Sequence, residues 1–210
     1  ILLVVDGVRM NNLIYRSGHL QNVITMDPNV IDRVEILSGP GSTVYGSDAL
    51  GGVVHFMTRK PALNPDGGWK LSGGASAGYQ SANNGLRLHA SLNAGSRKFA
   101  SLTAFTASDF GDLKMGAAGN PFYKESYYGE RPYYQDRING RDSLVSNPNK
   151  LVQKYSGYSQ LDIMQKILYS PSDNWQHSLN VQYSTSSDIP RYDRLTDPKG
   201  SGLNSAEWYY

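Results

Sequence analysis

Strict alternation of apolar and polar residues is the feature that most constrains the fold of this chain. It runs through residues 69–80, 86–95 and 175–186, and it returns with interruptions in residues 99–110 and 155–169. A repeat of two sustained over about ten residues is typical of a β-strand with one apolar and one polar face. The sequence therefore predicts five two-faced strands after about residue 69.

Soluble β-sandwiches show the same alternation, so the period alone leaves two architectures open. These strands are longer than the roughly 5–6 residues common in soluble sheets and match the ~9–11 residues that cross a bilayer at a tilt. Aromatic residues stand towards the strand ends, as in the belts of membrane barrels; they are Trp69, Tyr79, Tyr169, Trp175 and Tyr183. We therefore expect the first strands of an antiparallel transmembrane β-barrel, with a soluble sandwich as the alternative.

The connections between these strands support the barrel interpretation. Residues 96–98 and 170–174 are short connections, whereas residues 111–154 and 188–210 form long ones. Alternating short and long loops are typical of a barrel with turns on the periplasmic side and loops on the outside. About five strands cannot close such a barrel, so we expect this chain to be an excerpt of a longer protein.

Residues 1–60 follow a different pattern. An apolar run, residues 1–5, ends at Asp6-Gly7, and Asp27-Pro28 provides an N-cap and a first helical position. We expect a short helix through about residue 32 and strands over residues 34–37 and 53–58. The sequence thus predicts a small mixed α/β domain over residues 1–60, a linker over 61–68 and barrel strands over 69–210.

Composition excludes several classes of function. The chain has no cysteine, and its 20 Lys and Arg against 18 Asp and Glu give a net charge of only +2. Disulfides and thiol catalysis are therefore excluded, and no basic surface for nucleic acid is indicated. No catalytic triad or paired-carboxylate motif stands out, so we expect no enzymatic activity. No apolar run approaches the ~20 residues of a membrane helix.

The glycine-rich stretch 36–59 raises the question of a phosphate-binding loop. Its spacing is Gly39-x-Gly41 followed by Gly46, whereas a dinucleotide fingerprint needs G-x-G-x-x-G. Gly46 is followed by Ser47-Asp48, so the Lys of a Walker loop is missing. The stretch does not predict a phosphate site.

The same stretch fits the pattern G-P-x-S-x-x-Y-G-x-x-A-x-G-G-V. The matching residues are Gly39, Pro40, Ser42, Tyr45, Gly46, Ala49, Gly51, Gly52 and Val53. Together with Asp6-Gly7 and the segment around Arg33 and Glu35, this pattern closely resembles the plug domain of TonB-dependent outer-membrane receptors. Glycines here fit sharp turns and close backbones without any ligand. Arg33 and Glu35 lie two residues apart, so they share one face of an extended segment and could pair with the barrel wall.

This resemblance implies an active transporter in the outer membrane of a Gram-negative bacterium, with a plug that gates the barrel. It implies contact with outer-membrane lipid and with the TonB-ExbB-ExbD energy-transducing complex, through a motif expected upstream of this chain. It implies no intrinsic cofactor. The cargo would be a small-molecule iron complex, haem or a ferric siderophore; cobalamin, a glycan and a barrel without transport activity remain alternatives.

The loop before the short helix contains the first cargo-binding candidates: Tyr15, Arg16 and His19. Gly18-His19-Leu20 resembles the haem-receptor branch, in which a plug histidine offers an axial ligand. Neutral imidazole is a good iron ligand, so His19 is the candidate for binding haem iron. The alternative is that His19 forms a hydrogen bond within its loop or faces the barrel wall.

The loop 111–154 contains the second set of candidates, which combines flat rings with cations. They are Tyr123, Tyr127, Tyr128, Arg131, Tyr133, Tyr134 and Arg137. Rings stack on porphyrins or catecholates, and arginine pairs with carboxylates; stability at the headgroup level is the alternative role. Of the other histidines, we expect His55 and His177 to be structural and His89 to face the lumen.

Overall fold

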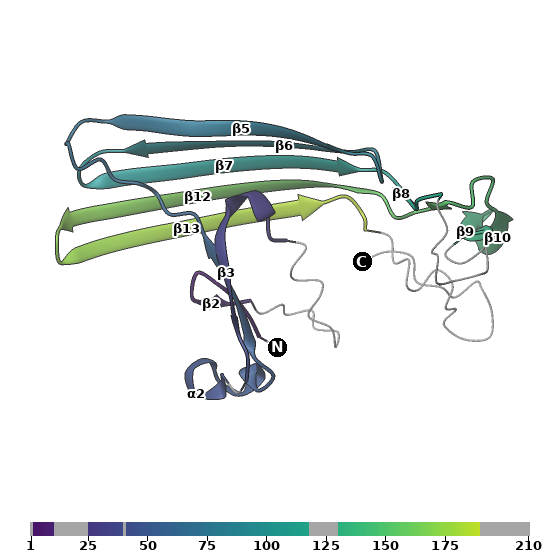
Figure 1. Ribbon diagram of the computed structural model, residues 1–210, viewed down its shortest axis with the longest axis horizontal. Helices are drawn as coiled ribbons and strands as arrows, with labels where there is room; N and C mark the ends of the chain where they lie inside the picture. The colour runs from purple at the N-terminus through teal and green to yellow at the C-terminus, as the bar shows by residue number, and fades with distance from the viewer. Residues whose placement is uncertain (1, 11–24, 40, 118–129, 190–210) are drawn as a thin grey trace. The chain divides into compact units, whose positions relative to one another are not determined.

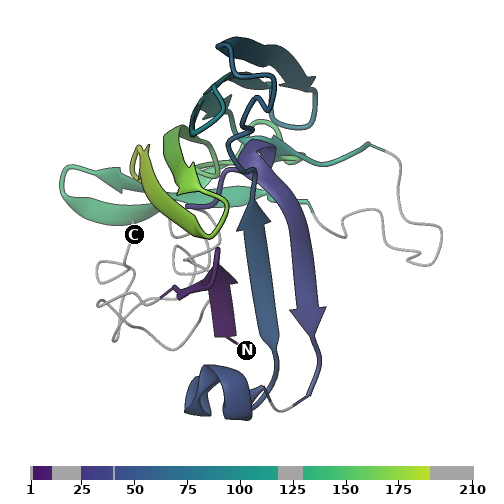
Figure 2. The ribbon, with the colours of Figure 1, turned by 90° about the vertical axis from the view of Figure 1, so that its left-hand side faces the viewer.

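The computed structural model describes residues 2–10, 25–39, 41–117 and 130–189. The N-terminal part holds a four-stranded sheet in the order β2-β1-β4-β3. Its strands are β1 (Leu2–Val5), β2 (Val8–Arg9), β3 (Ile31–Leu37) and β4 (Val53–Thr58). β1 runs parallel to β4, and β3 runs antiparallel to β4 (Figure 2). Three short helices, η1 (Pro28–Val30), α2 (Ser42–Tyr45) and η2 (Ser47–Ala49), complete this mixed α/β part.

The helix expected at Asp27 forms, but it is shorter than predicted. Asp27 caps it, because its side chain accepts a hydrogen bond of 3.0 Å from the Asn29 amide. The helix ends at Val30, and Ile31 is already extended and paired with Thr58 of β4. Because Ile31 pairs with β4, strand β3 begins three residues before the predicted start at residue 34.

The second sheet has five strands in the order β13-β12-β7-β6-β5 (Figure 1). These are β5 (Lys70–Gln80), β6 (Gly85–Gly95), β7 (Phe99–Phe110), β12 (Tyr158–Ser172) and β13 (Trp175–Ser186). All five strands predicted from alternation are thus confirmed. Only β12 is displaced, by three residues, because Tyr155 has a left-handed φ of 61° that a strand does not accept.

The stretch predicted as the long loop 111–154 contains strands of its own. β9 (Tyr133–Ile138) and β10 (Arg141–Ser146) form a hairpin, and β8 (Leu113–Lys114) pairs with β11 (Val152–Gln153). Asn139 and Gly140 turn the hairpin with φ of 51° and 78°. Asn-Gly is a strong hairpin signal because both positions accept a left-handed conformation. Residues 118–129, and most of the predicted loop 188–210, lie outside the described residues.

The two faces of the five-stranded sheet differ in exposure, and β6, β12 and β13 follow the predicted alternation. β7 reverses it, because its apolar phase faces inward together with the polar phase of β6. Leu88, Leu92, Leu179 and Val181 are 48%, 52%, 56% and 51% exposed. On the opposite phase, Leu102 and Ala104 of β7 and Met164 of β12 are buried in a cluster with Val30 of η1. Gln165, which interrupts the apolar phase of β12, bonds to Thr103 and Ser101 of β7 at 2.6 and 2.8 Å.

Contacts divide the chain into two compact units. The first comprises Ile1–Ser76, His89–Thr106 and Asp162–Thr185, and the second comprises Ala77–Leu88, Ala107–Leu161 and Ser186–Tyr210. Among the described residues, no helix is long and apolar enough to cross a membrane.

Candidate functional site

The glycine-rich segment is a set of tight turns, as expected. Gly52 has a φ of +112°, and a Cβ added there would lie 2.7 Å from the carbonyl oxygen of Leu37. Gly46 precedes η2 with φ 85° and ψ −179°, a conformation that is essentially restricted to glycine. Tyr45 packs on the small core formed by Leu2, Val4, Ala49 and Val53. Gly46 and Gly52 are therefore needed for the backbone conformation of these turns. Pro40 and the side chain of Ser42 lie outside the described residues.

Arg33 and Glu35 share one face of β3, as their spacing predicts. They bond to each other, Nε to Oε1 at 3.0 Å, and Arg33 also pairs with Asp32 at 3.3 Å. Both side chains are about half exposed, at 54% and 46%. The arginine therefore uses carboxylates of its own strand, and the predicted pairing with the barrel wall stays a prediction.

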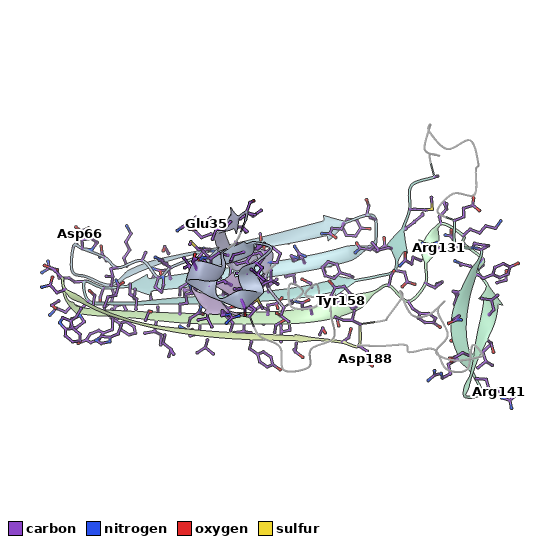
Figure 3. The ribbon with its side chains drawn as sticks, turned by 90° about the horizontal axis from the view of Figure 1, so that it is seen from below. Glu35, Asp66, Arg131, Arg141, Tyr158 and Asp188 are labelled. Atoms are coloured by element: carbon purple, nitrogen blue, oxygen red, sulfur yellow. The ribbon has the colours of Figure 1, made fainter. Side chains whose placement is uncertain are left out.

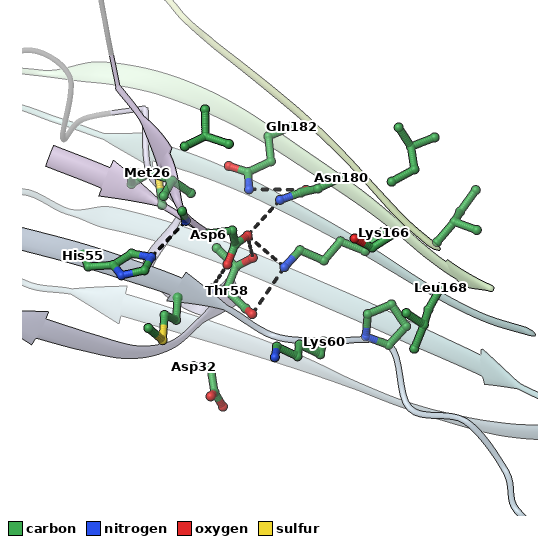
Figure 4. A pocket seen from close by; sticks show the side chains of 18 of the residues that line it. Asp6, Met26, Asp32, His55, Thr58, Lys60, Lys166, Leu168, Asn180 and Gln182 are labelled. Atoms are coloured by element: carbon green, nitrogen blue, oxygen red, sulfur yellow. Dashed lines mark hydrogen bonds and ion pairs between the residues drawn. The ribbon is translucent and has the colours of Figure 1, made fainter. Parts of the chain in front are cut away.

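Asp6, at the end of β1, binds residues from three other strands. Its Oδ1 accepts the Thr58 amide at 2.9 Å. Its Oδ2 accepts the Thr58 hydroxyl at 2.7 Å and the Asn180 amide at 2.8 Å, and it lies 2.9 Å from Nζ of Lys166. We call Asp6, Thr58, Lys166 and Asn180 the Asp6 cluster (Figure 4). It joins β1 and β4 of the first sheet to β12 and β13 of the second.

The Asp6 cluster is only partly shielded from water. The side chain of Lys166 is 9% exposed and that of Asp6 is 23% exposed. Burial acts to raise the pKa of Asp6, but hydrogen bonds from Lys166 and Thr58 and the lysine charge outweigh it, so the pKa lies below its usual 3.8. Lys166 also donates to the Thr58 carbonyl at 3.3 Å. An ionised carboxylate that only accepts suits this set of donors.

A second set of contacts joins η1 to strands β6 and β7. The Asp27 Oδ2 atom accepts the Thr106 hydroxyl at 2.6 Å, and Nδ1 of His89 lies 2.7 Å from that hydroxyl oxygen. Val30, three residues along, packs in the apolar cluster with Leu102 and Met164. We call Asp27, Val30, His89 and Thr106 the Asp27 corner. His89 thus faces the N-terminal part, as the polar phase of β6 predicts.

The predicted linker after β4 follows β6 closely. Arg59 donates to the Ser91 hydroxyl at 3.2 Å. Ala62 donates to and accepts from the Asn93 side chain at 2.9 and 3.1 Å. The next pair is a backbone bond of 2.9 Å from Asn64 to Ser96. Polar side chains of β6 are therefore matched to this segment in register.

A cavity of about 1240 Å³ opens beside the Asp6 cluster. His55 of β4 and Lys60, just after β4, line it on one side, and Asn180, Gln182 and Ser184 line it from β13. His55 is structural, as predicted, because its Nε2 accepts the Gly7 amide at 3.0 Å. Within the described part of the chain, no three His, Asp or Glu side chains come close enough to hold a metal ion.

The predicted cargo-binding residues are only partly described. Tyr15, Arg16, His19, Tyr123, Tyr127 and Tyr128 lie outside the described residues. The other four belong to the stretch around the β9–β10 hairpin, in which Figure 3 labels Arg131 and Arg141; they are Arg131, Tyr133, Tyr134 and Arg137. Their roles in binding stay predictions.

These four residues have different surroundings. Arg137 pairs with Asp142 at 2.8 Å, and Tyr134 makes an edge contact with Tyr155 at 5.8 Å. Tyr133 is 56% exposed. Tyr133 is therefore the most open of the described tyrosine candidates, whereas Arg137 and Tyr134 already support the hairpin region.

Sequence reasoning missed the residues that join the two sheets. In the sequence Asp6 marks only the end of a strand, and no local pattern singles out Lys166, Asn180 or Thr106. A usable signal existed for Lys166, because a lysine on the plug-facing phase of a strand needs a buried partner. Nothing in the local sequence identifies that partner as Asp6.

The glycine-rich turns and the mixed sheet agree with a comparison against known families. Residues 1–53 match the model of the TonB-dependent Receptor Plug Domain. These residues belong to the TonB-dependent receptor plug family. The resemblance inferred from the Gly39–Val53 pattern is thereby confirmed. We use the word plug for the predicted domain over residues 1–60, of which residues 1–53 match the family model.

Similar proteins extend the comparison beyond the plug. The chain is 31% identical over 189 residues to the vitamin B12 transporter BtuB of Vibrio vulnificus (strain CMCP6), covering 89% of this chain and 28% of that protein. It is 32% identical over 124 residues to a hemin receptor of Yersinia pestis, covering 57% and 17%. It is 32% identical over 69 residues to a ferrioxamine receptor of Yersinia enterocolitica, covering 33% and 9%.

The structure of the siderophore receptor PirA from Pseudomonas aeruginosa aligns with 89% of this chain and 26% of its own, at 16% identity and a TM-score of 0.49. The chain thus spans less than a third of the length of the relatives it matches. These relatives are receptors and a transporter, which confirms the expectation that the chain is not an enzyme.

Proposed function

We propose that this chain supplies the plug and the first barrel strands of an outer-membrane importer in a Gram-negative bacterium. The plug is residues 1–60, the linker 61–68, and the barrel strands and outer loops occupy 69–210. The observation that carries the proposal is the connection between a plug-family domain and a two-faced sheet through the Asp6 cluster and the Asp27 corner.

The exposed face of the five-stranded sheet supports its place in a lipid bilayer. Its strands are 11 to 15 residues long, enough to cross a bilayer at a tilt. Aromatic rings lie together at the strand ends. The ring centroids of Trp69 and Phe99 are 6.1 Å apart, and that of His177 lies 6.4 Å from Tyr169 and 6.0 Å from Trp175. Such a belt suits the membrane interface, where ring edges meet polar headgroups.

The energy for import would come from the TonB-ExbB-ExbD complex, acting on the plug. The cargo we propose is a small iron complex, haem or a ferric siderophore, and no intrinsic cofactor is needed. The names of two relatives, a hemin receptor and a ferrioxamine receptor, support this class. Gly18-His19-Leu20 favours haem within it, and the tyrosine-rich stretch 122–134 supplies rings for stacking.

Cobalamin is the second candidate cargo. One relative, which aligns with 89% of this chain, is a vitamin B12 transporter. Cobalamin is a large polar ligand, and its binding through polar contacts would not depend on His19. The two candidates therefore differ in what they require of the plug loop.

Uptake measurements on the full-length receptor in its host test the proposal. Cells would be given labelled haemin, ferrioxamine or vitamin B12, with and without an uncoupler that collapses the proton gradient, beside cells lacking the receptor. We expect one cargo to accumulate only in energised cells that carry the receptor. Equal accumulation with the uncoupler would contradict active import, and accumulation of none of the three would contradict the cargo class.

A further inference from the structure

The two contacts that join the plug to the five-stranded sheet differ in chemistry. At the Asp27 corner, hydrogen bonds among buried groups lie beside an apolar cluster that includes Val30, Leu102 and Met164. The Asp6 cluster is built around an ion pair whose carboxylate keeps 23% of its surface exposed. When the ion pair separates, water can hydrate both charges, whereas exposing apolar surface to water costs free energy. The Asp6 cluster is therefore the easier of the two to open.

β1, which ends at Asp6, is held in the plug sheet by parallel pairing with β4 over four residues, from Leu2 with Val53 to Val5 with Phe56. β2 is the edge strand and pairs with β1 over only two residues, Val4 with Arg9 and Val5 with Val8. At the other edge, β3 pairs with β4 over most of its length, from Leu37 to Ile31. The linker after β4 adds further bonds to β6 at Ser91, Asn93 and Ser96. A movement of the plug sheet as one body away from β12 and β13 keeps the β1–β4 pairing and breaks the contacts of Asp6 and Thr58 with Lys166 and Asn180.

The cavity lies on the side that such a movement would enlarge. It already holds about 1240 Å³ beside Asp6, and its β13 lining includes Asn180, Gln182 and Ser184. Gln182 also bonds to Asn180 at 3.4 Å, so polar groups continue along β13 from the Asp6 cluster (Figure 4). A lining of amides and hydroxyls suits a hydrated, polar cargo.

We infer that the Asp6 cluster is a releasable latch, and that the cavity along β12 and β13 is the route that widens when the latch opens. The Asp27 corner and the linker stay attached and act as the hinge. This inference rests on the proposed function, because it assigns the moving side of a plug that gates transport. It also assigns a role to Lys166, which closes the route by binding Asp6.

Cross-linking with introduced cysteines tests the latch, since the chain has no cysteine of its own. The full-length receptor would carry Asp6→Cys with Asn180→Cys, across the latch, or Ala62→Cys with Asn93→Cys, across the linker. We expect oxidation of the latch pair to abolish energised uptake while cargo still binds at the cell surface, and reductant to restore uptake. Oxidation of the linker pair should leave uptake close to that of the reduced receptor.

Unchanged uptake with the latch pair fully cross-linked would overturn the inference. Equal loss from both cross-links would also overturn it, because the linker would then be moving too. If the unmodified receptor imports none of the test cargoes, the proposed function fails, and the latch is still tested by passive leakage. Lys166→Met should then raise entry of a large antibiotic several-fold, with Lys166→Arg near the wild type.

Lys154→Met is the matched control for leakage. It makes the same exchange and removes an ion pair of 3.8 Å with Asp112, outside the plug and outside the cargo-binding candidates. We expect no added leakage from this variant. Leakage from Lys154→Met equal to that of Lys166→Met would indicate general damage to the receptor and overturn the assignment of the latch. No added leakage from Lys166→Met, at normal receptor levels, would do the same.

Discussion

The hydroxyl of Thr106, on β7, donates a hydrogen bond of 2.6 Å to Asp27, the residue that caps the first helix of the plug. The two residues are 79 positions apart, and both are buried. Because the hydroxyl has one proton and gives it to Asp27, the contact with His89 at 2.7 Å requires Nδ1 of His89 to be the donor. A single hydroxyl thus connects β6, β7 and the plug.

Thr106→Val should weaken attachment of the plug. The substitution keeps the shape of the side chain but leaves Asp27 Oδ2 and His89 Nδ1 without their shared partner. A buried polar group left without a hydrogen bond costs about 1–3 kcal/mol. We expect a lower urea midpoint for the purified receptor. Thr103→Val, on the same strand but bonded to Gln165 on the other face, should change it less; the reverse order would contradict the role of Thr106.

Gly52→Val should reduce the amount of folded receptor in the outer membrane. Gly52 has a left-handed φ of +112°, and any Cβ there meets the Leu37 carbonyl. Such strain costs on the order of 1–3 kcal/mol, and more for a β-branched residue. Gly74→Val is the control, because nothing lies within 4 Å of a Cβ at Gly74. Normal receptor levels with lost uptake would instead give the Gly52 segment a role in transport.

The Asp6 cluster should weaken in acid. The pKa of Asp6 lies below its usual 3.8 in the folded protein, so its contribution to stability is complete above that value. The contribution is lost as the pH falls through the lowered pKa. We expect the urea midpoint to drop below about pH 4 and Asp6→Asn to flatten this drop. Asp66→Asn, at an exposed turn of the linker, should keep it; an equal drop in Asp6→Asn would contradict the assignment.

His19→Ala separates the two iron cargoes. If His19 binds haem iron, its loss removes an axial ligand, so haemin affinity should fall and the Soret band should shift. A ferric siderophore has its iron saturated already, so the same change should leave its binding nearly intact. His177→Ala, a ring contact outside the plug, is the control. An unchanged haem spectrum in His19→Ala would end the assignment of His19.

Arg131→Ala and Arg137→Ala test the siderophore alternative. They should weaken binding of an anionic ferric complex through lost charge pairing. Because Arg137 already pairs with Asp142 at 2.8 Å, Asp142→Asn is the informative control. It breaks the same pair and leaves the arginine charged. Equal losses of binding from Arg137→Ala and Asp142→Asn would show that the hairpin, and not a charge offered to the cargo, is responsible.

The local sequence determined much of the architecture. Period-two alternation located β5, β6, β7, β12 and β13, because a strand exposes its two faces in a pattern that needs no distant partner to be recognised. The glycines at 46 and 52 indicated turns for the same reason, since a left-handed φ is a property of the residue itself. Asn139-Gly140 carried the same kind of signal for the β9–β10 hairpin, although the stretch was predicted as loop.

Only the tertiary structure decided how the plug is held. Asp6 and Lys166 are 160 positions apart in the sequence, and Asp27 and Thr106 are 79 positions apart. No rule of sequence spacing relates such residues. Arg33 is a second example: its expected partner is the barrel wall, but in the structure it pairs with Asp32 and Glu35 of its own strand. Local patterns fix which way a side chain faces along its own strand. Which charged group it meets depends on the register of two sheets brought together by folding, and that register is a property of the whole chain.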